Sequence, residues 1–463
     1  MCMMYIVYIM SFIRKIKKPS GTYLAEVESV WENGKTRQKV IRYIGKEVEG
    51  KPVRRIASSS VKVKAVKRHL DIEIINRIAA ELGITDLRPE ILAMVYSQLL
   101  DRPSINGMEE WLSHTDMLEI LGVDCMSTSM LYDALEELEE MDFSPIEASL
   151  SYIFSSIDEK NAVIIDITDT YFEGKSMGGD PRRGKEEKVK KLMQIALAVT
   201  EKHGFPLFHR TYGGNISGRR IFREMISILR ERGYESTIMD RGFYSRRNIK
   251  DALNLNVSII CGVIKDAEFR KILLEMQKDL IYRKENRIEL KNTHVYAKSM
   301  DFMSGKLIMV YNPMLESIRR EHYYEHSGDE EIASLLGYSL VYHNTSLSDR
   351  DVVRKYYAKD TVERAFRQMK GIISLRPVRV WLLSHVYGHI KVCYLAYAIL
   401  TMLQHRIEGT GMSGSDALEL LSHGYRVHLM DSESGLEWKA EVELSKKQEE
   451  IRNLVYKSQL KVR

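Results

Sequence analysis

The spacing of apolar positions changes abruptly along this chain. Between Asp71 and Ile157, apolar residues recur every three to four positions, which is the period of amphipathic helices, and Gly83, Pro103 and Gly122 interrupt the pattern. From Ala162 onward, short apolar runs such as AVIIDIT (162–168) replace it. Runs of this length with polar ends predict buried strands. The chain is therefore predicted to change from a helical region to a sheet-containing one.

The pattern predicts individual elements within both regions. Helices are expected at Asp71–Leu82, Pro89–Leu100, Met108–Leu121 and Ser127–Phe154. Strands are expected at Ala162–Thr168, Leu192–Thr200, Phe208–Tyr212, Ser236–Asp240 and Val257–Ile264, with helices at Gly218–Arg232 and Tyr244–Leu253. Later candidates are strands at Leu280–Tyr282, Arg287–Leu290, His294–Lys298 and Lys306–Tyr311, and an apolar helix at His385–Leu403. Strands that follow strands and then alternate with helices indicate an α/β fold class, α+β overall.

Composition shifts divide the chain into four parts. Residues 1–60 read as a basic β-hairpin region, because Asn33-Gly34 is a hairpin-turn signal between two strand-like stretches. Residues 61–157 form a predicted α-helical domain. Residues 158–405 form a predicted α/β domain with a mostly β insertion at about 265–350, and 406–463 form a C-terminal tail without assigned chemistry.

The charge distribution points to a polyanionic partner. The net charge is only +5, yet residues 1–70 carry 16 Lys/Arg against 5 Asp/Glu, and residues 71–160 carry 4 against 20. A basic arm and a basic body fit nucleic acid best. The four cysteines are far apart and form no CxxC pair, which fits a reducing cytosol rather than a disulfide framework. The 13 apolar residues that open the chain are too few to span a bilayer, and no other segment is expected to be long and apolar enough, so no membrane association is expected.

A helix predicted over Tyr356–Arg379 carries an unusual stripe. At about 100° per residue, the side chains of Tyr356, Lys359, Glu363, Arg367 and Lys370 fall on one narrow face. An apolar seam beside this face would press it toward the body of the protein. A solvated salt-bridge face is the ordinary interpretation of such a stripe. A carboxylate held among cations would also suit a metal ion and a polyanion.

Three acids are candidates for a shared site. Asp166 and Asp240 each end an apolar strand run, and Glu363 lies on the striped helix. Acids at the carboxyl ends of adjacent strands converge at one edge of a sheet. Converging carboxylates repel unless cations bind between them, and two Mg²⁺ ions are the usual solution in phosphoryl transfer. Asp169 is a second-ranked rival to Asp166.

A different chemistry is also open at the first strand. DITDT (166–170) resembles the aspartyl-phosphate loop of haloacid-dehalogenase-like phosphatases, in which a strand-end Asp is the nucleophile. Those enzymes need a later acidic pair for Mg²⁺, whereas Asp240 is followed by Arg241-Gly242. This alternative therefore ranks low.

The spacing of Tyr356, Lys359, Glu363 and Lys370 resembles the Tyr-Arg-Glu-Lys signature of DDE insertion-sequence transposases, with Lys in place of the usual Arg. DITDTYFEG (166–174) and MDRGFYS (239–245) resemble the two aspartate motifs of the family, in the same order. The resemblance covers roughly residues 10–405.

The resemblance implies an RNase H-like catalytic domain in which Asp166, Asp240 and Glu363 bind two Mg²⁺ ions, with Mn²⁺ as a substitute. It implies cleavage at terminal inverted repeats and strand transfer into target DNA, that is, cut-and-paste transposition. Expected partners are double-stranded DNA, at transposon ends and target, and a second copy of the chain in a paired-end complex. The expected location is the cytoplasm of a prokaryotic cell, at the nucleoid. A transposase-derived DNA-binding protein that has lost catalysis is the alternative.

Candidate DNA-binding residues come from two regions. Those of the body are Tyr356, Lys359, Arg367, Lys370 and Arg241, and those of the hairpin are Arg37, Lys39 and Arg42. Some members of the family stack an insertion tryptophan on a flipped base. This chain has no Trp between Trp111 and Trp381, so either Tyr282, Tyr296 or Phe302 substitutes for it or the step differs.

Overall fold

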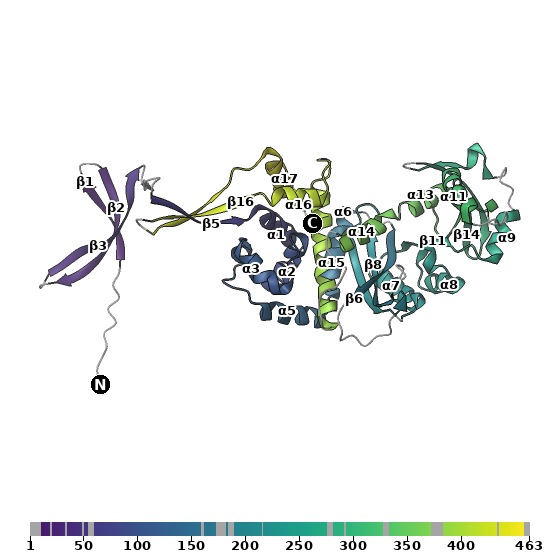
Figure 1. The fold of residues 1–463 in the computed structure, drawn as a ribbon, viewed down its shortest axis with the longest axis horizontal. Helices are drawn as coiled ribbons and strands as arrows, with labels where there is room; N and C mark the ends of the chain where they lie inside the picture. The colour runs from purple at the N-terminus through teal and green to yellow at the C-terminus, as the bar shows by residue number, and fades with distance from the viewer. Residues whose placement is uncertain are drawn as a thin grey trace, which may run out of the picture. The chain divides into compact units, whose positions relative to one another are not determined.

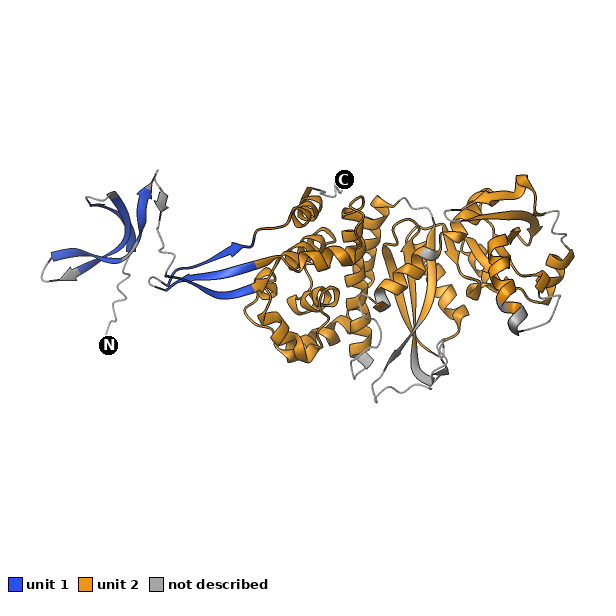
Figure 2. Ribbon diagram, turned by 45° about the horizontal axis from the view of Figure 1, so that its top comes forward, with its two compact units in different colours: residues 1–66, 426–442 blue, residues 67–425, 443–463 orange. Residues whose placement is uncertain are grey.

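The structure is a computed structural model. It describes residues 11–18, 21–32, 35–48, 51–53, 60–158, 162–172, 182–183, 189–214, 216–275, 281–290, 293–326, 333–371, 383–432 and 435–457. The fold is mixed α/β, with one large sheet and many helices (Figure 1). The chain divides into two compact units, Met1–Val66 with Arg426–Val442, and Lys67–Tyr425 with Glu443–Arg463 (Figure 2).

The first unit consists of strands. One sheet has the order β1-β2-β3-β4, and its strands are Ser11–Lys18, Gly21–Glu32, Lys35–Val48 and Lys51–Val53. A second sheet joins residues from both ends of the chain in the order β17-β16-β5, namely Glu437–Glu441, Tyr425–Asp431 and Val61–Arg68. Part of the stretch predicted as a tail thus pairs with a strand from the first seventy residues.

A β-bulge changes which positions share a face of the β2–β3 hairpin. The two strands pair antiparallel, with Arg37 opposite Val30 and Lys39 opposite Glu28. The register then shifts, so that position 42 lies opposite Glu26. Because residues 26, 28 and 30 alternate along β2, positions 37, 39 and 42 belong to one face of the hairpin.

The helices of the second unit surround one long apolar helix, α15 (Leu383–Arg406). Figure 1 shows α15 between the helices α1–α5 and the sheet, and α15 contacts α1, α2, α5 and β9. The helices that precede the sheet are α1 (Leu70–Glu81), α2 (Pro89–Leu99), α3 (Met108–Ser113), α4 (Met117–Ile120), α5 (Thr128–Glu140) and α6 (Ser144–Ile157), with the 3-10 turn η2 at Ile105–Gly107. After α15 come α16 (Gly414–Leu421) and α17 (Lys446–Lys457).

Two of the predicted helices are each split. Met108–Leu121 becomes α3 and α4, and Ser127–Phe154 becomes α5 and α6. The second split has a local cause, because Pro145 sits in the first turn of α6, where its missing N–H costs nothing, but it could not continue α5. Apolar periodicity runs through such breaks because both helices bury the same side against the core.

The large sheet has the order β12-β13-β14-β15-β11-β10-β6-β8-β7, and β9 also pairs with β8. Its strands are β6 (Val163–Phe172), β7 (Arg182–Arg183), β8 (Val189–Thr200), β9 (Pro206–Gly213), β10 (Ser236–Met239), β11 (Ser258–Val263), β12 (Arg287–Glu289), β13 (His294–Phe302), β14 (Gly305–Tyr311) and β15 (Tyr338–His343). Among the strand pairs formed by described residues of this sheet, only β6–β10 and β10–β11 are parallel. The strands predicted for an insertion extend the same sheet through the antiparallel pair β11–β15.

Helices accompany the sheet strands in chain order. They are α7 (Gly218–Glu231), α8 (Arg246–Asn254), α9 (Ala267–Glu275), α11 (Pro313–His326), α13 (Asp349–Tyr357) and α14 (Asp360–Gly371), with 3-10 turns η3 (Arg241–Phe243) and η4 (Lys284–Asn286). The strand predicted over Leu280–Tyr282 is wrong for Ile281 and Tyr282, and residue 280 lies outside the described residues. Ile281 instead accepts backbone and side-chain hydrogen bonds from Arg283 and Asn286, which close the chain into a turn.

A buried ion cluster joins α6 to the sheet. The Glu147 carboxylate on α6 is fully buried and accepts hydrogen bonds from the backbone N–H and Nδ1 of His209, at 2.8 and 2.9 Å. Guanidinium groups of Arg210 and Arg232 lie 2.9 and 3.0 Å from its other oxygen. Burial opposes ionisation of Glu147, but these donors outweigh it and lower its pKa to about 2.

Residues His385–Arg406 of α15 are also apolar and long enough to cross a membrane, which corrects the expectation that no segment of the chain is. However, 83% of its apolar 18-residue stretch is buried inside the protein, and the helix packs between the helices α1, α2 and α5 and the strand β9. The hydrophobicity of α15 is therefore that of a core helix.

Candidate active site

Sheet register places the two aspartates side by side. In the parallel pair β6–β10, Ile165 lies opposite Met239. Asp166 is the residue after Ile165 and Asp240 is the residue after Met239, so the two aspartates are also neighbours. Neighbouring strands are about 4.8 Å apart, and equal steps along parallel strands keep side chains on the same face. Asp166 does not end its strand as predicted, because β6 goes on pairing with β8 to Phe172. What ends at Asp166 is the pairing with β10.

The same register distinguishes Asp166 from Asp169, the second-ranked candidate. Residue 169 is three positions further along β6, so it belongs to the opposite face of the sheet. Asp166 is half-buried, and its Oδ1 accepts a hydrogen bond from the N–H of Ile167 at 2.8 Å.

Glu363 comes from α14, which packs against β6 and β8. The single helix predicted through Tyr356–Arg379 is wrong. α13 ends at Tyr357, and α14 begins at Asp360 after a turn in which Thr361 and Val362 bond only three residues back. The Thr361 hydroxyl bonds the carbonyls of Ala358 and Glu201, which favours a helix start here. Tyr356 and Glu363 thus lie on different helices, and residues 372–379 lie outside the described residues.

Lys359, in the turn between these helices, connects the acids. Its Nζ donates to Oδ1 of Asp240 at 2.5 Å. Burial works against both charges, yet the hydrogen bond and charge of Lys359 lower the pKa of Asp240 below its usual value. Burial likewise opposes the charge of Lys359, and its pKa is nonetheless raised by Asp240 and also by the charge of Glu363. The ammonium of Lys359 therefore interacts electrostatically with the carboxylates of both Asp240 and Glu363.

Tyr356 is the aromatic neighbour of Lys359. The Lys359 ammonium lies 5.1 Å from the centre of the Tyr356 ring, which is buried. Burial raises the pKa of the Tyr356 hydroxyl to about 12, so it stays neutral. The hydroxyl rests on the backbone of Gly262 in β11, where a Cβ would come within 2.2 Å of it and within 3.2 Å of the Cβ of Arg241. Sequence reasoning missed Gly262, because a lone glycine in an apolar strand carries no chemical signal.

Gly262→Ala is expected to displace Tyr356 and the turn that carries Lys359. We expect a loss of about 1–3 kcal/mol in unfolding free energy, since the Cβ has no room beside the Tyr356 ring. Thermal unfolding of the full chain measures this. Gly242→Ala is the matched control, because a Cβ there meets nothing within 4 Å. Equal stability of the two variants would contradict the close contact.

The residues fit a divalent metal of the Mg²⁺ type. Asp and Glu carboxylates are hard oxygen donors, and a cation already neutralises Asp240. Within the described residues, Asp166, Asp240 and Glu363 are not among the sets of metal-ligating groups whose atoms all lie within 4.8 Å of one another. Glu363 is exposed at the surface of α14. The two aspartates are thus adjacent by register, and Glu363 lies on α14, which packs against β6 and β8.

Sequence comparison decides the family. Residues 158–399, more than half of the chain, match the family described as transposase DDE domain. The chain belongs to this family. A structure of a piggyBac transposase synaptic complex with hairpin DNA, solved by cryo-EM, is similar with a TM-score of 0.43 and 14% identity, over 76% of each chain. No curated protein matches.

The other predicted DNA-binding residues of the DDE domain lie on η3 and α14. Arg241 is exposed on η3, immediately after Asp240. Arg367 is exposed on α14, and the side chain of Lys370 lies outside the described residues. In the first unit, Arg37 and Lys39 are exposed on β3, whereas the side chain of Arg42 also lies outside the described residues.

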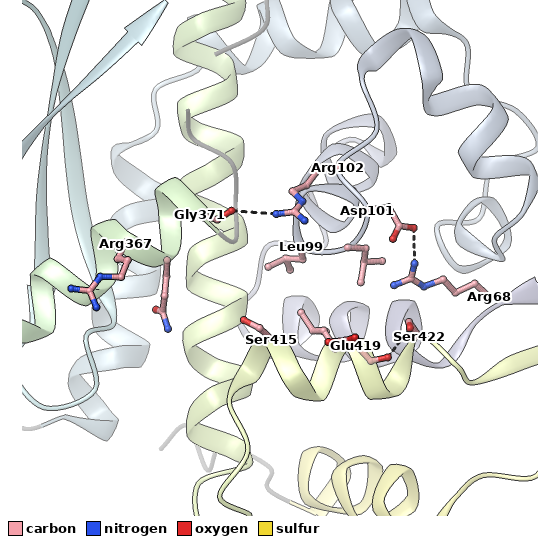
Figure 3. A pocket seen from close by; sticks show the side chains of 12 residues that line it. Arg68, Leu99, Asp101, Arg102, Arg367, Gly371, Ser415, Glu419 and Ser422 are labelled. Atoms are coloured by element: carbon pink, nitrogen blue, oxygen red, sulfur yellow. Dashed lines mark hydrogen bonds and ion pairs between the residues drawn. The ribbon is translucent and has the colours of Figure 1, made fainter. Parts of the chain in front are cut away.

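Arg367 borders a cavity of about 620 Å³ next to the DDE domain. Residues of α14 line one side of it, and residues of α2 and α16 line the others (Figure 3). Arg102 donates to the carbonyl of Gly371 at the end of α14, and Arg68 pairs with Asp101, at 3.2 and 2.6 Å. The cavity thus has three arginines on its walls.

Of the three aromatic candidates for base stacking, Tyr282 has the most accessible ring. It is 55% exposed and packs on Tyr296, with ring centroids 4.3 Å apart. Tyr296 itself is buried. The ring of Phe302 lies between those of Phe269 and Tyr342, with ring centroids 5.6 and 6.2 Å away.

Proposed function

We propose that this protein is an active cut-and-paste transposase of an insertion sequence. It binds the terminal inverted repeats, cleaves DNA there, and joins the freed 3′-hydroxyl to target DNA. One observation carries the proposal: Asp166 and Asp240 are adjacent by sheet register, and a single lysine lies in the field of both Asp240 and Glu363. A salt bridge on the solvated face of one helix would not join Lys359 to Asp240, which lies 119 positions away.

The three carboxylates are the proposed metal ligands. Asp166, Asp240 and Glu363 would hold two Mg²⁺ ions, with Mn²⁺ as a substitute. When bound, the ions would supply the charge that activates the attacking oxygen and stabilises the leaving one. The strand order β9-β8-β6-β10-β11, with only β6–β10 and β10–β11 parallel, supports an RNase H-like domain as the scaffold.

Lys359 would change partners during the reaction. In the free protein its ammonium neutralises Asp240. A cation that took the Asp240 oxygen would release the ammonium, which could then bind a DNA phosphate. Lys in place of Arg suits this exchange, because an ammonium is a point charge without a fixed bidentate geometry.

DNA would be held by cations on both units. Tyr356, Arg241, Arg367 and Lys370 are the proposed contacts near the cut, and the hairpin positions Arg37, Lys39 and Arg42 are proposed for the repeats. The common face of those three hairpin positions supports a shared role. We further propose a homodimer that pairs two transposon ends, acting at the nucleoid in the cytoplasm of a prokaryotic cell.

Cleavage of the element's own ends tests the proposal. Linear DNA carrying the terminal repeats of this element should be nicked in Mg²⁺ or Mn²⁺ and remain intact in EDTA. DNA with scrambled ends is the control. If the protein bound the repeats but cut them in neither metal, the alternative of a DNA-binding protein without catalysis would replace the proposal.

Arg367→Ala is expected to weaken DNA binding modestly and uniformly across sequences. Loss of one phosphate contact should reduce the slope of log K against log salt by about 0.9. Binding measured between low and moderate salt gives the slope. Arg230→Ala, at the far end of α7, is the charge-matched control. An unchanged slope for Arg367→Ala would remove this residue from the DNA contacts.

A further inference from the structure

A second cluster of metal-ligating groups lies apart from the three acids. It contains His203 in the turn between β8 and β9, His405 near the end of α15, and Glu408 just after that helix. One ligand atom from each residue lies within 4.8 Å of the other two. All three belong to the second unit. The proposed DNA chemistry uses none of them.

The geometry of the cluster is specific. Oε2 of Glu408 lies 3.5 Å from Nε2 of His203 and 3.5 Å from Nδ1 of His405. The imidazole rings meet edge to face, with centroids 4.7 Å apart. Both nitrogens are shielded from solvent, and neither has a hydrogen-bond partner within the described part of the chain. Glu408 is 63% exposed, so the cluster has one open side.

Asp158 determines which nitrogen of His203 is available. Its carboxylate accepts hydrogen bonds from Nδ1 and the backbone N–H of His203 and from the hydroxyl of Thr200. Because Nδ1 is held by Asp158, Nε2 is the nitrogen of His203 that faces Glu408. A metal cation between Nε2 and the carboxylate oxygen would bind both. A carboxylate that orients a ligating histidine is also the usual outer partner of a zinc site.

His405 presents the second nitrogen. Its Nδ1 is shielded from solvent and lies 3.5 Å from Oε2 of Glu408. Arg406, the nearest cation in sequence, is engaged elsewhere by Glu81 at 3.0 Å. The cluster thus offers two imidazole nitrogens and one carboxylate.

These donors match a transition metal better than Mg²⁺. Two His and one Glu, with a fourth position left to water, form one of the common zinc donor sets. Two ligands each about 2.1 Å from a tetrahedral zinc lie about 3.4 Å apart. The two 3.5 Å separations agree with that spacing. Imidazole nitrogen is a poor ligand for Mg²⁺, which prefers oxygen.

We propose that His203, His405 and Glu408 form a zinc-type metal site, distinct from the carboxylate centre, with Asp158 as the residue that orients His203. The site ties the β8–β9 turn to the end of the core helix α15. The same turn holds the start of α14, because Thr361 donates to the carbonyl of Glu201 at 3.2 Å. Metal binding therefore stabilises the attachment of the helix that carries Glu363.

Cobalt substitution tests the site without measuring DNA cleavage. The full chain, stripped with a chelator, is titrated with Co²⁺ and followed by visible absorption. One equivalent is expected to give the intense ligand-field bands of tetrahedral Co²⁺, which Zn²⁺ then displaces. Co²⁺ at the carboxylate centre would have oxygen ligands and absorb only weakly. Zn²⁺ is also expected to raise the melting temperature of the stripped protein.

Variants assign the signal to these residues. His203→Gln and His405→Gln should lose the bands, and Glu408→Gln, a change at an exposed position that preserves the fold, should lower Zn²⁺ affinity about tenfold or more. Glu363→Gln should retain the bands, so this test and that of the transposase proposal fail independently. Absence of tetrahedral bands in the wild type, or equal bands in all three site variants, would overturn the metal site.

Discussion

Glu363→Gln is expected to reduce metal-dependent cleavage of the element's ends by about a thousandfold or more. The amide keeps the shape of the side chain but removes the charge that a divalent ion needs beside the two aspartates. Because Glu363 is exposed on α14 and makes no contribution to the core, the fold should be unaffected. Single-turnover cleavage in Mg²⁺ measures the loss, and a binding assay on the same DNA should give a nearly unchanged affinity.

Glu235→Gln is the matched control for this variant. Glu235 lies just before β10 in the same unit, its side chain is 83% exposed, and it belongs to no predicted site. Cleavage by Glu235→Gln should equal that of the wild type. If Glu363→Gln weakened DNA binding as much as cleavage, Glu363 would have a structural or DNA-binding role instead of a metal-binding one.

Glu147→Gln is expected to destabilise the second unit by about 3 kcal/mol at pH 7. The amide cannot neutralise Arg210 and Arg232, so it leaves two guanidinium groups uncompensated beside a fully buried position. Urea unfolding followed by circular dichroism measures the loss. The matched control is Glu137→Gln, which removes a half-exposed ion pair with Arg88 and should cost less than about 1 kcal/mol.

The loss in Glu147→Gln should also depend on pH in a defined direction. The pKa of Glu147 is lowered from 4.5 to about 2 in the folded protein, so its ionised form stabilises the fold above pH 4.5. That contribution disappears as pH falls from 4.5 toward 2. The stability difference between wild type and variant should therefore shrink over this interval. A difference that stayed constant down to pH 3 would contradict the lowered pKa of Glu147.

Local periodicity predicted most elements of the second unit well. The apolar runs at β6, β8, β9, β10 and β11 are strands, and the closing helix at His385–Leu403 is α15. Strands and helices of this kind bury one or both faces, so their period is visible in the residues themselves. Errors occurred where a break keeps the apolar phase. At both the α5–α6 junction and the turn at Ala358–Lys359, buried apolar residues occur on each side of the break.

The candidate site was predicted in part. Asp166, Asp240 and Glu363 could be chosen because their residue types and strand-end or helical positions are written in the sequence, and the family match over residues 158–399 agrees with that choice of region. The relative positions of these acids could not be predicted from the sequence. The adjacency of Asp166 and Asp240 depends on the β6–β10 register, and the opposite face of residue 169 depends on it too.

By itself, then, the sequence determined the α/β fold class, the choice of candidate acids and the basic character of the hairpin, because each follows from residue type and short-range spacing. Only the tertiary structure decided that Lys359 leaves the striped face to pair with Asp240, that Gly262 makes room for Tyr356, and that His203 meets His405 and Glu408. These contacts join residues about 100 to 200 positions apart. The packing of helices on the sheet brings such residues together, and no local pattern in the chain encodes that packing.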